Sequence, residues 1–77
     1  LNKQLQRAPE YQAARFLQAA AICCRDGVKK GRRAFNEIKD DVLSAEVITI
    51  AGEELAKTLT RAGRLKNATN IKKATSG

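Results

Sequence analysis

The chain has 77 residues, including 15 Lys and Arg, 8 Asp and Glu and no His, so its formal net charge is +7 and its pI is about 9.9. With no His and 2 Cys, the sequence excludes a His-based metal or acid–base site and a scaffold held by several disulfides. We therefore expect no enzymatic activity, no cofactor and no metal. Hydrophobic residues make up 43% and aromatic residues 4%, which indicates one small domain with a core of Ala, Leu, Ile and Val.

The first predicted element is a helix over residues 9–29, preceded by an N-terminal extension at residues 1–8. Pro9 suits the first turn of a helix because it lacks the N–H that this turn leaves unpaired. Glu10 favours the positive end of the helix dipole. Small and apolar residues then recur at intervals of three and four, the spacing of one helix face: Ala13, Leu17, Ala20, Cys24 and Val28.

One long helix or two nearly collinear helices are predicted over residues 33–62, after a turn at residues 27–31 that contains two glycines. The apolar residues of this range keep intervals of three or four throughout: Phe35, Ile38, Val42, Ala45, Ile48, Ala51, Leu55, Leu59 and Ala62. Gly52 and the aspartates at residues 40–41 are positions where this helix could bend. The β-branched residues 47–50 leave one alternative open, a short strand that pairs between two copies of the chain.

Residues 64–77 contain Asn, Thr, Ser and Lys but no anion, so we expect a basic, weakly structured tail. Just before it, the string Glu-Leu-Ala-Lys-Thr-Leu at residues 54–59 is similar to the opening of helix-turn-helix DNA-binding motifs. The chain departs from that motif at Thr60 and Arg61, because the turn of a helix-turn-helix has glycine and then an apolar residue at these positions. It departs again at Lys66, where the recognition helix buries a side chain. A helix-turn-helix is therefore a minor alternative.

Together these elements predict an all-α fold in which residues 9–63 form a helical hairpin, completed by oligomerisation or by a partner. A helix of about 20 residues cannot cover one of about 30, and so small a chain rarely stabilises an Ala-rich core alone. The apolar residues left uncovered predict an interface with other copies of the chain: Ile48, Ile50, Ala51, Leu55 and Leu59. We interpret Cys23 and Cys24 as small packing residues, because neighbouring side chains on a helix diverge too far to share a metal or a disulfide.

Charge is segregated along the chain. Residues 1–33 carry 8 cations and 2 anions, residues 34–56 carry 1 and 6, and residues 57–77 carry 6 and none. A stripe of Lys and Arg with only Tyr11 as a possible stacking ring is typical of proteins that bind phosphates rather than read bases. We therefore predict that two clusters of cations bind nucleic acid: Arg25, Lys29, Lys30, Arg32 and Arg33 in the first, and Lys57, Arg61, Arg64, Lys66, Lys72 and Lys73 in the second.

This pattern favours a small basic assembly protein that binds DNA or RNA without strong sequence readout, such as a coat, packaging or accessory component of a virus or mobile element. The alternative is a protein-interaction subunit or inhibitor whose apolar and acidic helix face docks a partner protein. The longest uncharged, mainly apolar stretch, residues 16–24, is far shorter than the ~20 residues that span a bilayer. We expect no membrane contact and a location in the cytoplasm or within a virion.

Overall fold

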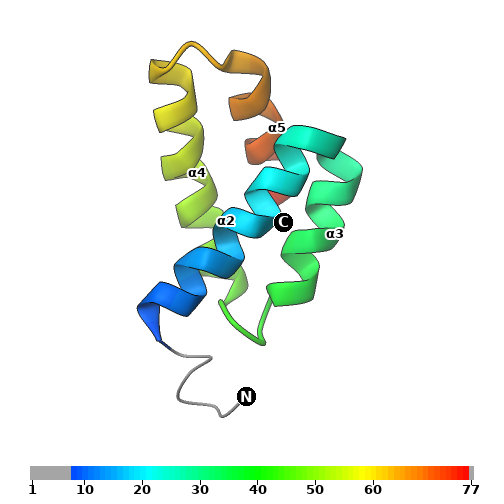
Figure 1. The fold of residues 1–77 in the computed structure, drawn as a ribbon, viewed down its shortest axis with the longest axis vertical. Coiled ribbons are helices and arrows are strands. Elements are labelled where there is room, and N and C mark those ends of the chain that lie inside the picture. Colours follow the sequence, from blue (N-terminus) through cyan, green and yellow to red (C-terminus); the bar gives the residue numbers. More distant parts are fainter. Residues whose placement is uncertain (1–7, 77) are drawn as a thin grey trace.

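The computed structural model describes residues 8–76, and over this range the chain is all-helical, as the sequence predicted (Figure 1). The helices are α2 (Pro9–Asp26), α3 (Val28–Ile38), α4 (Ala45–Arg61) and α5 (Leu65–Thr75). They form two pairs, α2 with α3 and α4 with α5, and α5 also packs on α3 and α2. Apart from Ala8, the predicted N-terminal extension lies outside the described residues.

The first helix ends earlier than the sequence predicted, because Gly27 separates α2 from α3. Gly27 has a φ of 102°, which favours glycine, and its N–H donates to the Cys23 carbonyl oxygen at 2.9 Å. The predicted turn at residues 27–31 is therefore wrong after its first residue, and Gly31 lies inside α3. A Cβ at Gly31 would stand 2.7 Å from the Cys23 Sγ atom, so the glycine allows α3 to approach α2 closely.

The prediction of one helix, or of two nearly collinear helices, over residues 33–62 is also wrong, because α3 and α4 run in different directions (Figure 1). Residues 39–44 form a connection in which Asp40 has a φ of 68° and donates its N–H to the Leu43 carbonyl oxygen at 2.7 Å. Ser44 then caps α4, since its hydroxyl oxygen accepts the Val47 N–H at 3.2 Å. Gly52 lies within α4, and residues 47–50 are helical, so the strand alternative is excluded.

The tail was predicted to be weakly structured, but most of it forms α5. Gly63, with a φ of 80°, reverses the chain, and the Arg64 N–H donates to the Leu59 carbonyl oxygen at 2.8 Å. The helix buries one narrow stripe of mostly small residues against α3 and α4: Ala68, Ile71, Ala74 and Thr75. The residues 54–59 that are similar to a helix-turn-helix opening lie near the end of α4, just before this reversal.

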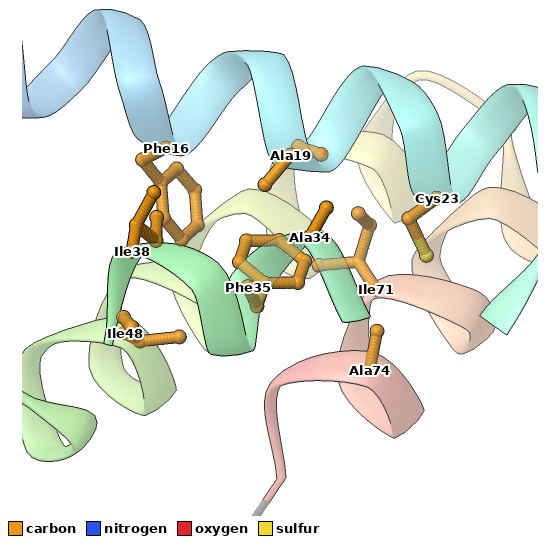
Figure 2. Packing of buried hydrophobic residues seen from close by; sticks show 10 residues of the cluster. Phe16, Ala19, Cys23, Ala34, Phe35, Ile38, Ile48, Ile71 and Ala74 are labelled. Atoms are coloured by element: carbon orange, nitrogen blue, oxygen red, sulfur yellow. The ribbon is translucent and has the colours of Figure 1, made fainter. Parts of the chain in front are cut away.

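The core lies mainly between α2 and α3 and is closed by α5 and part of α4 (Figure 2). The rings of Phe16 and Phe35 pack with their centroids 5.3 Å apart. The largest fully buried side chains are Ile38, Ile71 and Cys23, from three different helices. Burial of these side chains links the two helical pairs into one unit.

The fold also changes the surroundings of the predicted oligomer interface. Ile48 is only 4% exposed and belongs to the core of its own chain, while Ala51, Leu55 and Leu59 pack partly against that core. Ile50, in contrast, is 53% exposed. Helix α5 thus supplies part of the cover that the sequence argument assigned to a second copy. Within residues 8–76, no helix combines the length and the hydropathy needed to cross a membrane.

Candidate nucleic-acid interface

The two predicted basic clusters meet at a contact between Arg32 and Lys73. The Arg32 Nη2 group of α3 donates to the Lys73 carbonyl oxygen of α5 at 2.9 Å, across 41 residues of sequence. That carbonyl lies in the last turn of α5, where carbonyl groups lack partners within the helix and a cation is favourable. The contact therefore holds the C-terminal end of α5 beside α3 (Figure 1).

Helix α3 presents its cations to solvent because its opposite face is buried. The buried residues of this helix are Gly31, Ala34, Phe35 and Ile38, and they all lie on the side that faces the core. The four cations of α3 are all exposed: Lys29, Lys30, Arg32 and Arg33. An open hollow of about 630 Å³ runs along this helix and is lined by Val28, Lys29, Arg32, Arg33, Asn36 and Glu37.

Two further hollows continue this surface across α5 to α4. The first, of about 260 Å³, shares Arg32 and Asn36 with the hollow on α3 and adds Lys39. The second, of about 410 Å³, shares Thr49 and Ser76 with the first and adds Lys57 and Lys72. We call this surface the basic face and define it by the cations that line the three hollows: Lys29, Arg32, Arg33, Lys39, Lys57 and Lys72.

The basic face does not include every predicted cation. Arg61, Arg64 and Lys66 lie around the turn between α4 and α5 and line none of the three hollows. Lys30 and Lys73 have exposed side chains beside it, whereas Arg25 pairs with Asp26 at 3.0 Å. Lys39 was not predicted to bind, because it is the only cation among residues 34–56 and belongs to neither cluster in the sequence.

Few carboxylates oppose the basic face. Glu37 and Glu53 each line one of the outer hollows, and Glu54 contacts Lys57 at 3.4 Å across exposed side chains. Among residues 8–76, the five other cations of the basic face form no ion pair. Away from this face, a hydrogen bond from Arg25 lowers the pKa of the Asp26 carboxyl group. The cations of the basic face are thus available to an anionic ligand.

The described part of the chain offers little to other kinds of chemistry. It contains no group of three or more His, Cys, Asp or Glu side chains placed to hold a metal ion. Cys23 is buried and Cys24 is half-buried, and both thiols are free. Burial, followed by the neighbouring Cys24, raises the pKa of the Cys23 thiol. Cys23 therefore packs as a small neutral residue.

Comparisons of the chain with protein-family models, with curated proteins and with solved structures found no match. The geometry and charge of the basic face are therefore the basis for a proposed function.

Proposed function

We propose that this protein binds the phosphate backbone of nucleic acid through its basic face, as a small helical coat, packaging or accessory protein with little sequence readout. The observation that carries this proposal is the Arg32–Lys73 contact, which joins two distant clusters of cations on one surface. Phosphates neutralised by Lys and Arg release condensed counterions, and this release favours binding whatever the base sequence.

The cations lie on three helices, which supports binding along the phosphate backbone of a nucleic acid. Lys29 and Arg33 lie on α3, Lys57 lies on α4 and Lys72 lies on α5. A compact site for one free phosphate would gather its donors around one point, whereas these residues line successive hollows. An extended polyanion can contact them one after another.

A salt titration with matched variants tests this proposal. Binding of fluorescent random-sequence DNA and RNA is measured by anisotropy from about 50 to 300 mM salt, where the slope of log affinity against log salt counts the neutralised phosphates, at about 0.9 for each in duplex DNA. The triple variant Lys29→Gln, Arg33→Gln, Lys72→Gln removes three charges from the basic face. The control variant Arg61→Gln, Arg64→Gln, Lys66→Gln removes three charges outside it.

We expect the first variant to lower the slope by about two to three and the control to change it much less. Equal losses would mean that net charge, rather than this face, determines binding. Failure of the unaltered protein to bind at about 50 mM salt would reject the proposal.

A second candidate function is docking of a partner protein on the outer side of α4. Val47 and Ile50 lie one turn apart on this helix and are 45% and 53% exposed. Three exposed glutamates accompany them on α4: Glu46, Glu53 and Glu54. This function predicts a partner that binds at fixed stoichiometry, survives nuclease treatment and is lost on Ile50→Glu.

A further inference from the structure

The middle hollow of the basic face differs from its neighbours in two respects. Its lining includes Phe35, Ile48 and Ala74, buried side chains that are 2%, 4% and 5% exposed and come from α3, α4 and α5 (Figure 2). It is also the one hollow of the three with no carboxylate in its lining. Only small parts of these three side chains reach the hollow, so its floor is a narrow apolar strip below a cationic rim. This combination suits a ligand that places a planar apolar ring against the strip and an anionic group at the rim.

The rim carries both charge and a free amide. Arg32 and Lys39 line the hollow from α3 and the residue after it. The hydrogen bond to the Lys73 carbonyl oxygen holds Arg32 in place, and its remaining N–H groups stay available. Among residues 8–76, the exposed Asn36 side chain forms no hydrogen bond, so its amide can both donate to and accept from the edge of a planar ring.

The size of the hollow limits the ligand. A volume of about 260 Å³ is slightly below the range of roughly 300–1,000 Å³ that is typical of sites for drug-sized molecules. It suits one ring system rather than a whole dinucleotide. A bare phosphate would not use the apolar floor, because contact with it would remove water from the phosphate without giving a hydrogen bond in return.

We propose that this hollow accepts one unstacked nucleobase of a single-stranded nucleic acid, while Arg32 and Lys39 hold the flanking phosphates. The inference rests on the proposed function and names its substrate class. Bases of a duplex are stacked and paired, whereas those of a single strand are free to enter such a site. The protein should therefore prefer single strands to duplexes of the same charge.

The test compares three fluorescent ligands by anisotropy: a single-stranded oligothymidylate, an abasic strand with the same number of phosphates and a duplex of matched charge. We expect the oligothymidylate to bind roughly tenfold more tightly than the abasic strand, since contacts to bases add to the shared phosphate contacts. Equal affinity of the two strands, with the expected salt slope, would overturn the base site and leave the proposed function intact. Failure of all three ligands to bind would overturn the proposed function itself.

A pair of charge-neutral variants locates the base. Ala45 is exposed and lines the hollow, so Ala45→Leu should narrow it without disturbing the core. Ala62 is exposed and lies outside the hollow, so Ala62→Leu is the control. We expect Ala45→Leu to remove most of the tenfold preference for bases while keeping the salt slope, and Ala62→Leu to keep both. Retention of the full preference in Ala45→Leu would contradict this location.

Discussion

Gly52 of α4 lies directly against Thr75 of α5, and a Cβ at residue 52 would stand 2.6 Å from the Thr75 Cβ atom and 2.7 Å from its Cγ2 atom. The Thr49 hydroxyl, on the same side of α4, donates to the Thr75 carbonyl oxygen at 3.1 Å. These contacts hold the end of α5 on α4, while Arg32 holds it on α3. The position of the basic face thus depends on one close helix crossing.

We predict that Gly52→Ala destabilises the protein although alanine is the better helix former. Overpacking of a tight contact costs about 1–3 kcal/mol, and the gain in helix propensity offsets about 1 kcal/mol of this. The unfolding free energy, measured by urea denaturation, should fall by about 1 kcal/mol. In a double-mutant cycle, Thr75→Gly should remove this penalty, because it deletes the whole side chain that the new Cβ would meet. A stabilising Gly52→Ala would show that the crossing is looser than described.

We predict that Arg32→Gln loosens the last turn of α5, whereas Arg33→Gln does not. Both substitutions remove one exposed charge from adjacent positions of α3, but Arg32 alone donates to the Lys73 carbonyl oxygen. Loss of that hydrogen bond should lower the unfolding free energy by about 1 kcal/mol. Hydrogen exchange of the Ser76 N–H, which donates to the Lys72 carbonyl oxygen at 2.9 Å, should become faster only in Arg32→Gln. The same exchange rate in both variants would contradict the role of Arg32.

We predict a loss of stability at high pH that depends on Cys23. Burial favours the neutral thiol in the folded state and raises its pKa, so this contribution is fully present below the pKa of the unfolded thiol, about 8.5. It is lost as the pH rises past that value toward the pKa of the folded thiol. The unfolding free energy should therefore fall more steeply above about pH 8.5 in the unaltered protein than in Cys23→Ala. Identical pH profiles would indicate that the thiol is not buried.

At neutral pH, Cys23→Ala itself should cost about 1 kcal/mol, the usual range for a small truncation in a core. The half-buried Cys24 provides the comparison, because Cys24→Ala should change the stability less.

We predict that copies of the chain associate through the outer side of α4. Val47 and Ile50 leave an apolar strip exposed there, and its burial in a second copy would be favourable. The melting temperature should then rise with protein concentration, and Ile50→Glu should abolish that rise. Leu65→Glu is the control, since Leu65 is 62% exposed but lies at the start of α5. A melting temperature independent of concentration would contradict self-association through this strip and would favour a different partner protein there.

Local sequence was sufficient for the fold class and for part of the core. Pro9 begins α2 as its chemistry predicts, and Phe35, Ile38 and Ile48 of the predicted apolar register are buried. The predicted face of α2 is partly wrong, because Ala13 and Leu17 are exposed and the helix buries Phe16, Ala19 and Cys23. Apolar periodicity did not reveal the break at residues 39–44, because the apolar register continues through it. The break depends on the positive φ of Asp40 and on the Ser44 cap, which periodicity does not register.

Helix α5 and the basic face were decided by tertiary packing. The segment that forms α5 resembles a polar tail in isolation, because its few apolar residues are mainly small. It forms a stable helix only where α2, α3 and α4 cover those residues. The sequence alone predicted which residues are basic but not which of them share a surface. Arg32 and Lys73 meet across 41 residues, Lys39 joins them, and Arg61 does not. Exposed charges contribute little to the free energy of folding, so their grouping follows from how the buried faces of the helices pack.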